Sequence, residues 1–115
     1  MNAEISRNEL KAKIDRGDKF FLVETLPEDK FRHEHLPHAI NVPPERVKDL
    51  AAQILPNKDA EIVVYCGSSS CNASEHAAKD LTAQGYHHVR RYVEGKQDWT
   101  EAGLPTESGI PASAV

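Results

Sequence analysis

The sequence predicts a single α/β domain of three layers, in which a central parallel sheet of about four to five strands is flanked by helices. The length supports one domain, because 115 residues can bury one compact core and leave little room for a second. Short apolar runs typical of strands alternate with amphipathic segments typical of helices. Such alternation is typical of βαβ units, which build parallel sheets covered by helices. No internal repeat, low-complexity tract or interdomain linker interrupts it.

The first expected element is a helix over residues 7–16. Ser6 and Glu9 have the spacing of a capping box, in which each side chain binds the backbone amide of the other residue. Gly17 is suited to end the helix, because glycine readily adopts the left-handed conformation that follows many helices. Ile5 and Leu10 stand at the two positions of a hydrophobic staple, which also predicts that the helix begins here.

Four apolar runs predict the strands of the sheet. They cover residues 20–23, 39–42, 62–65 and 89–93. The first and third runs are continuously apolar, as is typical of strands buried on both faces. The last run is more polar and is expected nearer an edge of the sheet.

Helices are expected between these strands. Residues 28–34 are charged and predict a loop or one or two helical turns. The prolines at 43 and 44 suit the opening of a helix, whose apolar stripe would consist of Val47, Leu50, Ala51 and Ile54. Another helix, closed by Gly85, would carry the apolar residues Ala73, Ala77, Ala78 and Leu81. We expect the domain to occupy residues 1–106 and to be followed by a loosely ordered tail over residues 107–115.

Charge and composition exclude several classes of function. A net charge of −4 disfavours a surface for nucleic acid or for an anionic membrane. Residues 1–14 are polar and lack the apolar core of a signal peptide, and no apolar run is long enough to cross a bilayer. Two cysteines without a signal indicate intracellular thiols, so the expected location is the cytoplasm.

The chemistry is expected at Cys66, which directly follows the most apolar strand. In an open parallel sheet, ligands bind beyond the carboxyl ends of the strands. The next residues are small, which lets successive backbone amides turn inward and hold an anion; they are Gly67, Ser68, Ser69 and Ser70. The helix that starts near Ala73 adds partial positive charge. Both effects favour the thiolate of Cys66, which is the nucleophilic form.

These residues also have purely structural interpretations. Free cysteine is commonly a small buried hydrophobic residue, but a structural Cys66 would not need a loop suited to curl amides around its sulfur. Cys71 is either a second thiol, which resolves a persulfide or forms a disulfide with Cys66, or a small loop residue without a redox role. The hydroxyls of residues 68–70 could bind a sulfur species, although the backbone amides are the stronger candidates.

Three stretches of the chain resemble the single-domain rhodaneses. The segment HLPHAINVP at residues 35–43 is similar to the family's GHIPGAINIP, with Glu34 and His38 in place of two glycines. The segment VVYC at residues 63–66 resembles the strand that leads to the family's catalytic cysteine. The family's C-terminal signature is matched by Gly85-Tyr86, by residues 92–99 and by Gly103-Leu104-Pro105.

This resemblance implies the rhodanese-like fold and a sulfurtransferase that needs no cofactor. Cys66 would take a sulfane sulfur from a small anion such as thiosulfate, hold it as a persulfide and pass it to a thiol or to cyanide. The amides of residues 67–71 would stabilise the thiolate and the persulfide. Glu24 matches the acidic residue that the family commonly has after the early strand. The sequence carries no signal for an oligomeric state.

The loop departs from the common family pattern at Cys71, which stands where rhodaneses usually have an Arg or Lys for thiosulfate. The arrangement resembles a subgroup with a Cys-x4-Cys-x-x-Ser loop, here Cys66, Cys71 and Ser74. We therefore expect weak activity with thiosulfate. Arg90 and Arg91 could assist an anionic donor, but they are interpreted as solvated surface.

Two other classes of function are weighed against sulfur transfer. A dual-specificity phosphatase shares this fold but needs a loop arginine to hold phosphate, and none lies between Cys66 and Arg90. The main alternative is a non-catalytic or redox-sensing module that uses Cys66 and Cys71.

The histidines predict structure rather than metal binding. The spacing of His33, His35 and His38 is not that of structural zinc ligands, so we expect no metal site. His35 is expected to organise the loop around Pro37 through hydrogen bonds, and Trp99 to anchor the packing of the C-terminal turns.

Overall fold

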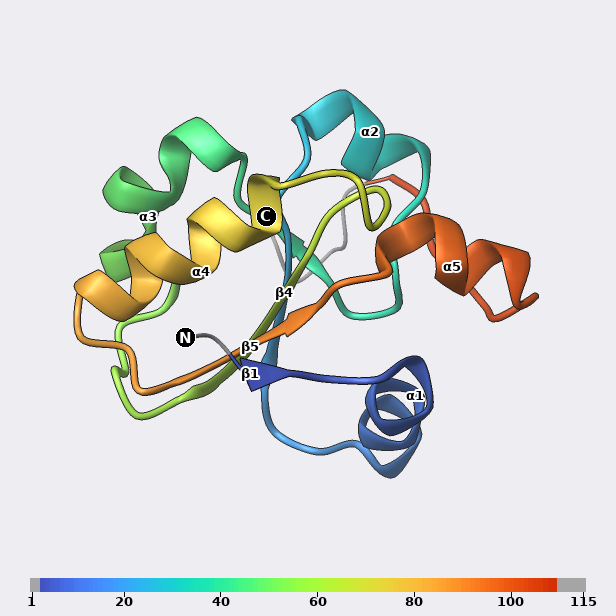
Figure 1. Cartoon of the computed structure of the whole chain (residues 1–115), viewed down its shortest axis with the longest axis horizontal. Coiled ribbons are helices and arrows are strands. Elements are labelled where there is room, and N and C mark those ends of the chain that lie inside the picture. The colour runs from blue at the N-terminus through green and yellow to red at the C-terminus, as the bar shows by residue number, and fades with distance from the viewer. Residues whose placement is uncertain (1–2, 110–115) are drawn as a thin grey trace.

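The computed structural model describes residues 3–109 as one five-stranded parallel sheet with helices on both faces (Figure 1). The strands are β1 (Ala3–Glu4), β2 (Phe21–Glu24), β3 (Ile40–Asn41), β4 (Glu61–Tyr65) and β5 (His88–Tyr92). The helices are α1 (Arg7–Arg16), α2 (Glu28–His33), the 3-10 turn η1 (Pro44–Arg46), α3 (Val47–Ile54), α4 (Ala73–Ala83) and α5 (Gly95–Glu101). The strand order is β1-β5-β4-β2-β3 and every neighbouring pair is parallel, which confirms the predicted fold class.

Helix α1 begins and ends where the sequence predicts. Ser6 Oγ accepts a hydrogen bond from the amide of Glu9 at 3.1 Å, and Gly17 ends the helix with φ 72°. The carboxylate of Glu9, which the capping box assigns to the Ser6 amide, instead accepts two hydrogen bonds from Arg90 on β5. A tertiary ion pair therefore replaces half of the expected cap.

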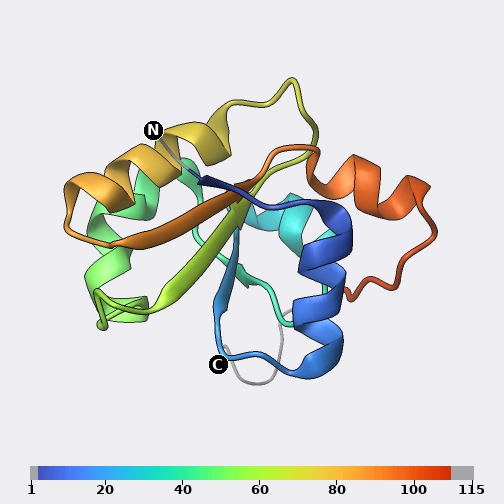
Figure 2. The same ribbon diagram turned by 60° about the horizontal axis from the view of Figure 1, so that its bottom comes forward.

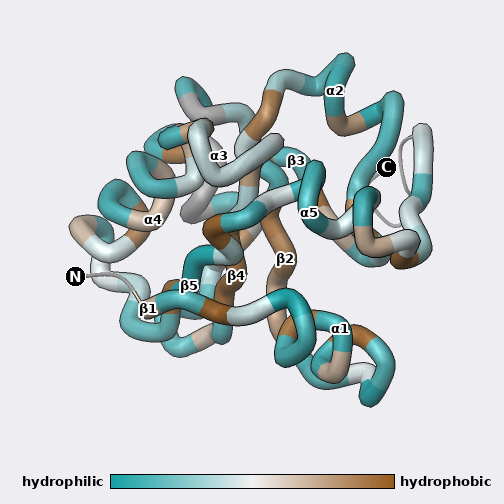
Figure 3. Tube along the Cα trace, turned by 45° about the vertical axis from the view of Figure 1, so that its right-hand side comes forward, coloured by the Kyte–Doolittle hydropathy of each residue, from teal (hydrophilic) through white to brown (hydrophobic). Residues whose placement is uncertain are grey.

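The sheet separates two apolar cores, because successive residues of a strand point to opposite faces. On β4, Ile62 and Val64 face the core that contains buried residues of α3 and α4. Val63 and Tyr65 face the other core, to which α1, α2 and α5 contribute. The two groups of helices lie on opposite sides of the sheet (Figure 2), and the apolar colouring of β2 and β4 shows that the core follows these central strands (Figure 3).

Three features differ from the expectations or go beyond them. Strand β1 has only two residues, too few for a periodic signal, and it covers β5, so that β5 lies one strand in from the edge. Helix α5 begins at a left-handed Gly95 in a segment that the apolar pattern does not mark. In α3, Val47 is buried as the apolar stripe predicts. The side chains of the other residues of this stripe are not among those that the structure describes; these residues are Leu50, Ala51 and Ile54.

The first residues of the expected tail are held by backbone hydrogen bonds. Glu107 and His35 exchange two such bonds, at 2.8 and 2.9 Å, and the amide of Gly109 binds the carbonyl of Arg32. Residues 107 and 109 are therefore attached to α2 and to the residues that follow it. Residues 110–115 lie outside the described residues. None of the helices between residues 3 and 109 is long and apolar enough to span a bilayer.

Candidate active site

Cys66 lies at the carboxyl end of β4, the central strand of the sheet, and it is 1% exposed. The chain then turns through residues 67–72 before α4 begins, and the amide of Cys71 binds the carbonyl of Ser68 at 3.1 Å. The small residues expected to form this loop do so: Gly67 and Ser68 are half-buried, whereas Ser69 and Ser70 are exposed. We call residues 66–72 the cysteine loop.

The cysteine loop rests on the beginning of α5 (Figure 1). The amides of Lys96 and Gln97 donate to the carbonyls of Cys66 and Gly67, both at 2.8 Å. At Gly95, an added Cβ would lie 2.5 Å from the Cys66 carbonyl oxygen and 2.9 Å from the Ser68 nitrogen. Only glycine permits this approach, so α5 and the loop hold each other in place.

The sulfur of Cys66 has polar neighbours on α4 and on its own loop. Sγ lies 3.3 Å from the carbonyl oxygen of Cys71 and 3.7 Å from Oγ of Ser74, a residue of α4 that is 1% exposed. Burial raises the pKa of Cys66 and the hydrogen bond to Cys71 raises it further, against the lowering by the amide and hydroxyl of Ser74. In the resting protein, Cys66 is therefore held as a thiol at neutral pH.

Cys71 receives the stabilisation that the sequence assigned to Cys66. Its partial burial acts to raise the pKa, but hydrogen bonds from the Cys66 thiol and from the amides of Ala73 and Gly67 lower it overall, as does the charge of Arg91. The expectation that the loop amides favour a Cys66 thiolate is wrong for this resting state, because the Gly67 amide reaches the second sulfur. Both sulfurs are free, and each shifts the pKa of the other.

Arg91 belongs to this site, although its sequence context predicts a solvated surface residue. Its Nε donates to Ser74 Oγ at 2.9 Å and its Nη2 to the Cys71 carbonyl at 3.3 Å. Arg90 points to the other face of the sheet and binds Glu9 on α1. The alternation along β5 separates the two arginines, but only the packing of α4 shows which one reaches the cysteines.

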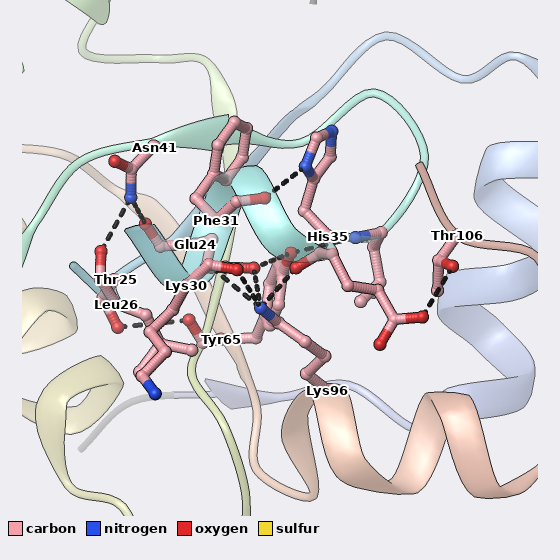
Figure 4. A network of polar contacts seen from close by, with 12 residues as sticks. Glu24, Thr25, Leu26, Lys30, Phe31, His35, Asn41, Tyr65, Lys96 and Thr106 are labelled. Atoms are coloured by element: carbon pink, nitrogen blue, oxygen red, sulfur yellow. Dashed lines mark hydrogen bonds and ion pairs between the residues drawn. The ribbon is translucent and has the colours of Figure 1, made fainter. Parts of the chain in front are cut away.

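A buried polar network lies beneath the loop and also escaped sequence reasoning, apart from Glu24 (Figure 4). The Glu24 carboxylate is 0% exposed; it accepts a hydrogen bond from the Tyr65 hydroxyl at 2.8 Å and lies 3.1 Å from Lys96 Nζ. The same ammonium donates to the carbonyls of Lys30 and Glu34 at the end of α2. Lys96 therefore connects α2 to Glu24 and, through Glu24, to Tyr65, the residue before Cys66.

Trp99 is a buried packing residue as expected, whereas the side chain of His35 binds α2 rather than the residues around Pro37. The His35 ring is fully buried, stacks on Phe31 with ring centres 3.9 Å apart, and makes a 2.8 Å hydrogen bond to the Phe31 carbonyl through Nδ1. Trp99 is fully buried and donates from Nε1 to the Pro105 carbonyl at 2.8 Å. Among the described residues, no three His, Cys, Asp or Glu side chains come together where they could hold a metal ion.

Fold and site together define a class of protein: a parallel α/β domain that holds a cysteine at the carboxyl end of its central strand, in a loop of small residues. The chain belongs to the rhodanese-like domain family, whose model matches residues 6–102. The resemblance found in the sequence is therefore confirmed, and members of this family that carry sulfurtransferase names indicate sulfur transfer as its general chemistry.

The chain is 32% identical over 107 residues to the HTH-type transcriptional regulator Rv0324 of Mycobacterium tuberculosis, covering 93% of this chain and 46% of that protein. It is 35% identical over 113 residues to the adenylyltransferase and sulfurtransferase UBA4 of Candida albicans, covering 93% of this chain and 25% of that protein. The chain thus spans less than half the length of these relatives. A solved structure titled rhodanese with anions, from E. coli, is 28% identical with a TM-score of 0.65, over 77% of this chain and 98% of that one.

Proposed function

We propose that this protein is a sulfurtransferase that carries sulfane sulfur on Cys66. The observation that carries the proposal is the position of Cys66 Sγ at the end of the central strand, 3.7 Å from a buried serine hydroxyl and beside a second sulfur. The backbone amide and the hydroxyl of Ser74 can stabilise a negative sulfur there, as an oxyanion hole stabilises a developing anion.

In the first step, the Cys66 thiolate attacks the outer sulfur of thiosulfate or of a related persulfide. With thiosulfate, a new S–S bond forms on Cys66, the S–S bond of the donor breaks, and sulfite leaves with the bonding electron pair. In the second step, an acceptor thiolate attacks the outer sulfur of the persulfide, which regenerates the Cys66 thiolate and yields the acceptor persulfide. Cyanide as acceptor yields thiocyanate.

The test is sulfur loading of Cys66→Ser. Serine keeps the small loop but lacks the nucleophile, so we expect sulfur transfer from thiosulfate to cyanide to fall to background while the thermal unfolding curve stays close to that of the wild type. Mass spectrometry of the loaded wild type should show one added sulfur, about 32 Da, on Cys66. Substantial activity in a folded Cys66→Ser variant would exclude the proposal.

The interaction between the two cysteines favours a second candidate, a redox-sensing role in which Cys66 and Cys71 form a disulfide. Cys71 would attack the inner sulfur of a Cys66 persulfide, which forms the Cys66–Cys71 disulfide and expels sulfide. The product loses about 2 Da relative to the reduced protein instead of gaining sulfur. Cys71→Ser should still load sulfur on Cys66 and should lose this disulfide, whereas loss of loading in that variant would make Cys71 the carrier.

A further inference from the structure

The two neighbouring arginines of β5 have opposite surroundings. Arg90 is neutralised, because its Nη1 and Nη2 donate to the two Glu9 carboxylate oxygens at 2.7 and 2.9 Å. Arg91 faces α4, is half-buried, and donates side-chain hydrogen bonds to the Ser74 hydroxyl and to the Cys71 carbonyl. Within residues 3–109, no carboxylate is ion-paired with Arg91. Its full positive charge is therefore directed at the cysteine loop without a neutralising partner.

Arg91 is connected to Cys66 through a single hydroxyl. Because Ser74 Oγ accepts the hydrogen bond from Arg91 Nε, its own proton remains to be donated. Cys66 Sγ lies 3.7 Å from that oxygen, within reach of a hydrogen bond to a negatively charged sulfur. Arg91 thus both places a charge at the loop and orients the hydroxyl that faces the sulfur.

We propose that Arg91 is the anion-binding residue of the Cys66 site and selects anionic sulfur donors. It supplies from β5 the cation that rhodaneses usually carry in the loop, where this chain has Cys71. The proposal rests on the proposed function and deepens it, because it assigns the donor class: a small anion such as thiosulfate, with its oxygens toward Arg91 and its outer sulfur toward Cys66. It also reverses our expectation of weak thiosulfate activity.

The test compares Arg91→Gln with Arg90→Gln, which removes the same charge on the opposite face. Cysteine alkylation is measured with iodoacetate, an anion, and with iodoacetamide, a neutral reagent of similar size, and fragment-ion mapping assigns the rates to Cys66 and Cys71. The measured quantity is the iodoacetate rate divided by the iodoacetamide rate. Because both reagents react with the thiolate, a change in the thiolate fraction of a cysteine cancels in this ratio. We expect the ratio to fall about three- to tenfold in Arg91→Gln, to change less than about twofold in Arg90→Gln, and to be largely kept in Arg91→Lys.

Salt provides a measurement that needs no variant. A local positive charge makes the iodoacetate rate of the wild type fall as salt rises, whereas the net charge of −4 would make it rise. The proposal would be overturned if the ratio of iodoacetate to iodoacetamide rates were unchanged in a folded Arg91→Gln variant. It would also be overturned if the iodoacetate rate of the wild type rose with salt.

Sulfur transfer is measured on the same variants. Arg91→Gln should raise the KM for thiosulfate several-fold with a smaller change in kcat, and Arg90→Gln should not. If the alkylation ratio depends on Arg91 but the wild type transfers no sulfur, then Arg91 binds anions and only the proposed function is wrong. If sulfur is transferred but neither the ratio nor the KM depends on Arg91, then only the role of Arg91 is wrong.

Discussion

Two sulfur atoms occupy one short loop, and their surroundings shift their pKa values in opposite directions. Cys66 is 1% exposed, and burial raises its pKa; Cys71 is half-buried, and hydrogen bonds from Cys66, Ala73 and Gly67 lower its pKa despite partial burial. The reaction proposed for Cys66 therefore requires that its proton leave when the donor arrives. Ser74 and Arg91 are the groups positioned to stabilise the resulting thiolate.

At the residue scale, we expect Cys71 to be alkylated before Cys66 when the resting protein meets iodoacetamide at neutral pH. The lowered pKa of Cys71 gives it a larger thiolate fraction at neutral pH, so its alkylation rate should rise at a lower pH than that of an ordinary thiol. The alkylation rate of Cys66, whose pKa is raised, should rise at a higher pH. Fragment-ion mapping over a pH series checks the order. Cys66→Ala should move the Cys71 profile to higher pH, because a hydrogen bond to the thiolate is lost; faster labelling of Cys66 would contradict the assignment.

At the scale of elements, the cysteine loop and the start of α5 form one unit. Two amides of α5 bind carbonyls of the loop, and Gly95 with φ 73° brings the two backbones into contact. The loop therefore needs no long side chains to hold its shape, which leaves its small residues free to surround a sulfur species.

We expect Gly95→Ala to destabilise the protein more than Gly103→Ala. Both glycines have positive φ, at 73° and 76°, so both substitutions carry a conformational penalty of about 1–2 kcal/mol. Nothing lies within 4 Å of an added Cβ at Gly103, whereas at Gly95 it would meet the Cys66 carbonyl oxygen at 2.5 Å. Denaturant unfolding should show the additional loss only for Gly95→Ala, together with slower sulfur loading; equal losses would mean that the contact is not important.

At the scale of the whole molecule, a buried ion pair connects segments that are far apart in the sequence. Lys96 Nζ lies 3.1 Å from the carboxylate of Glu24, 72 residues away, and also binds the end of α2. Burial raises the pKa of Glu24, against the lowering by the Tyr65 hydroxyl and by Lys96. This pair joins β2, α2 and α5 behind the cysteine loop.

We expect Lys96→Met to lower the free energy of unfolding by about 3–5 kcal/mol at pH 7, because it leaves a buried carboxylate without its cation. Lys79→Met, which removes an exposed ion pair with Glu75, should lower it by less than about 1 kcal/mol. Adding Glu24→Gln to Lys96→Met should recover part of the loss. A loss as small as that of Lys79→Met would show that the buried pair does not hold the fold together.

The pH dependence of Lys96→Met has a definite sign. Without the ammonium, the pKa of Glu24 in the folded state rises further above its unfolded value. A carboxyl whose pKa is higher in the folded state than in the unfolded state stabilises the fold at pH values below its unfolded-state pKa. That stabilisation is lost as the pH rises through its folded-state pKa. The penalty of Lys96→Met should therefore be smaller near about pH 4.5 than at pH 7, which unfolding curves at both values can measure.

The sequence by itself determined the features that depend on local pattern. The capped helix of residues 7–16, the buried strand before Cys66 and the small residues after it follow from periodicity, capping and turn chemistry within a few residues of each other. Because a parallel sheet presents its strand ends at one edge, these local patterns also placed the candidate site.

Only the tertiary structure decided how charge is distributed at that site. The Gly67 amide reaches Cys71, α4 packs against the face of β5 that carries Arg91, and Lys96 of α5 meets Glu24 at the end of β2. Alternation along β5 places Val89 and Arg91 on one face and Arg90 on the other, but it does not say which helix covers each face. Burial and electrostatic contacts between residues distant in sequence depend on packing, and no local pattern of residues encodes that packing.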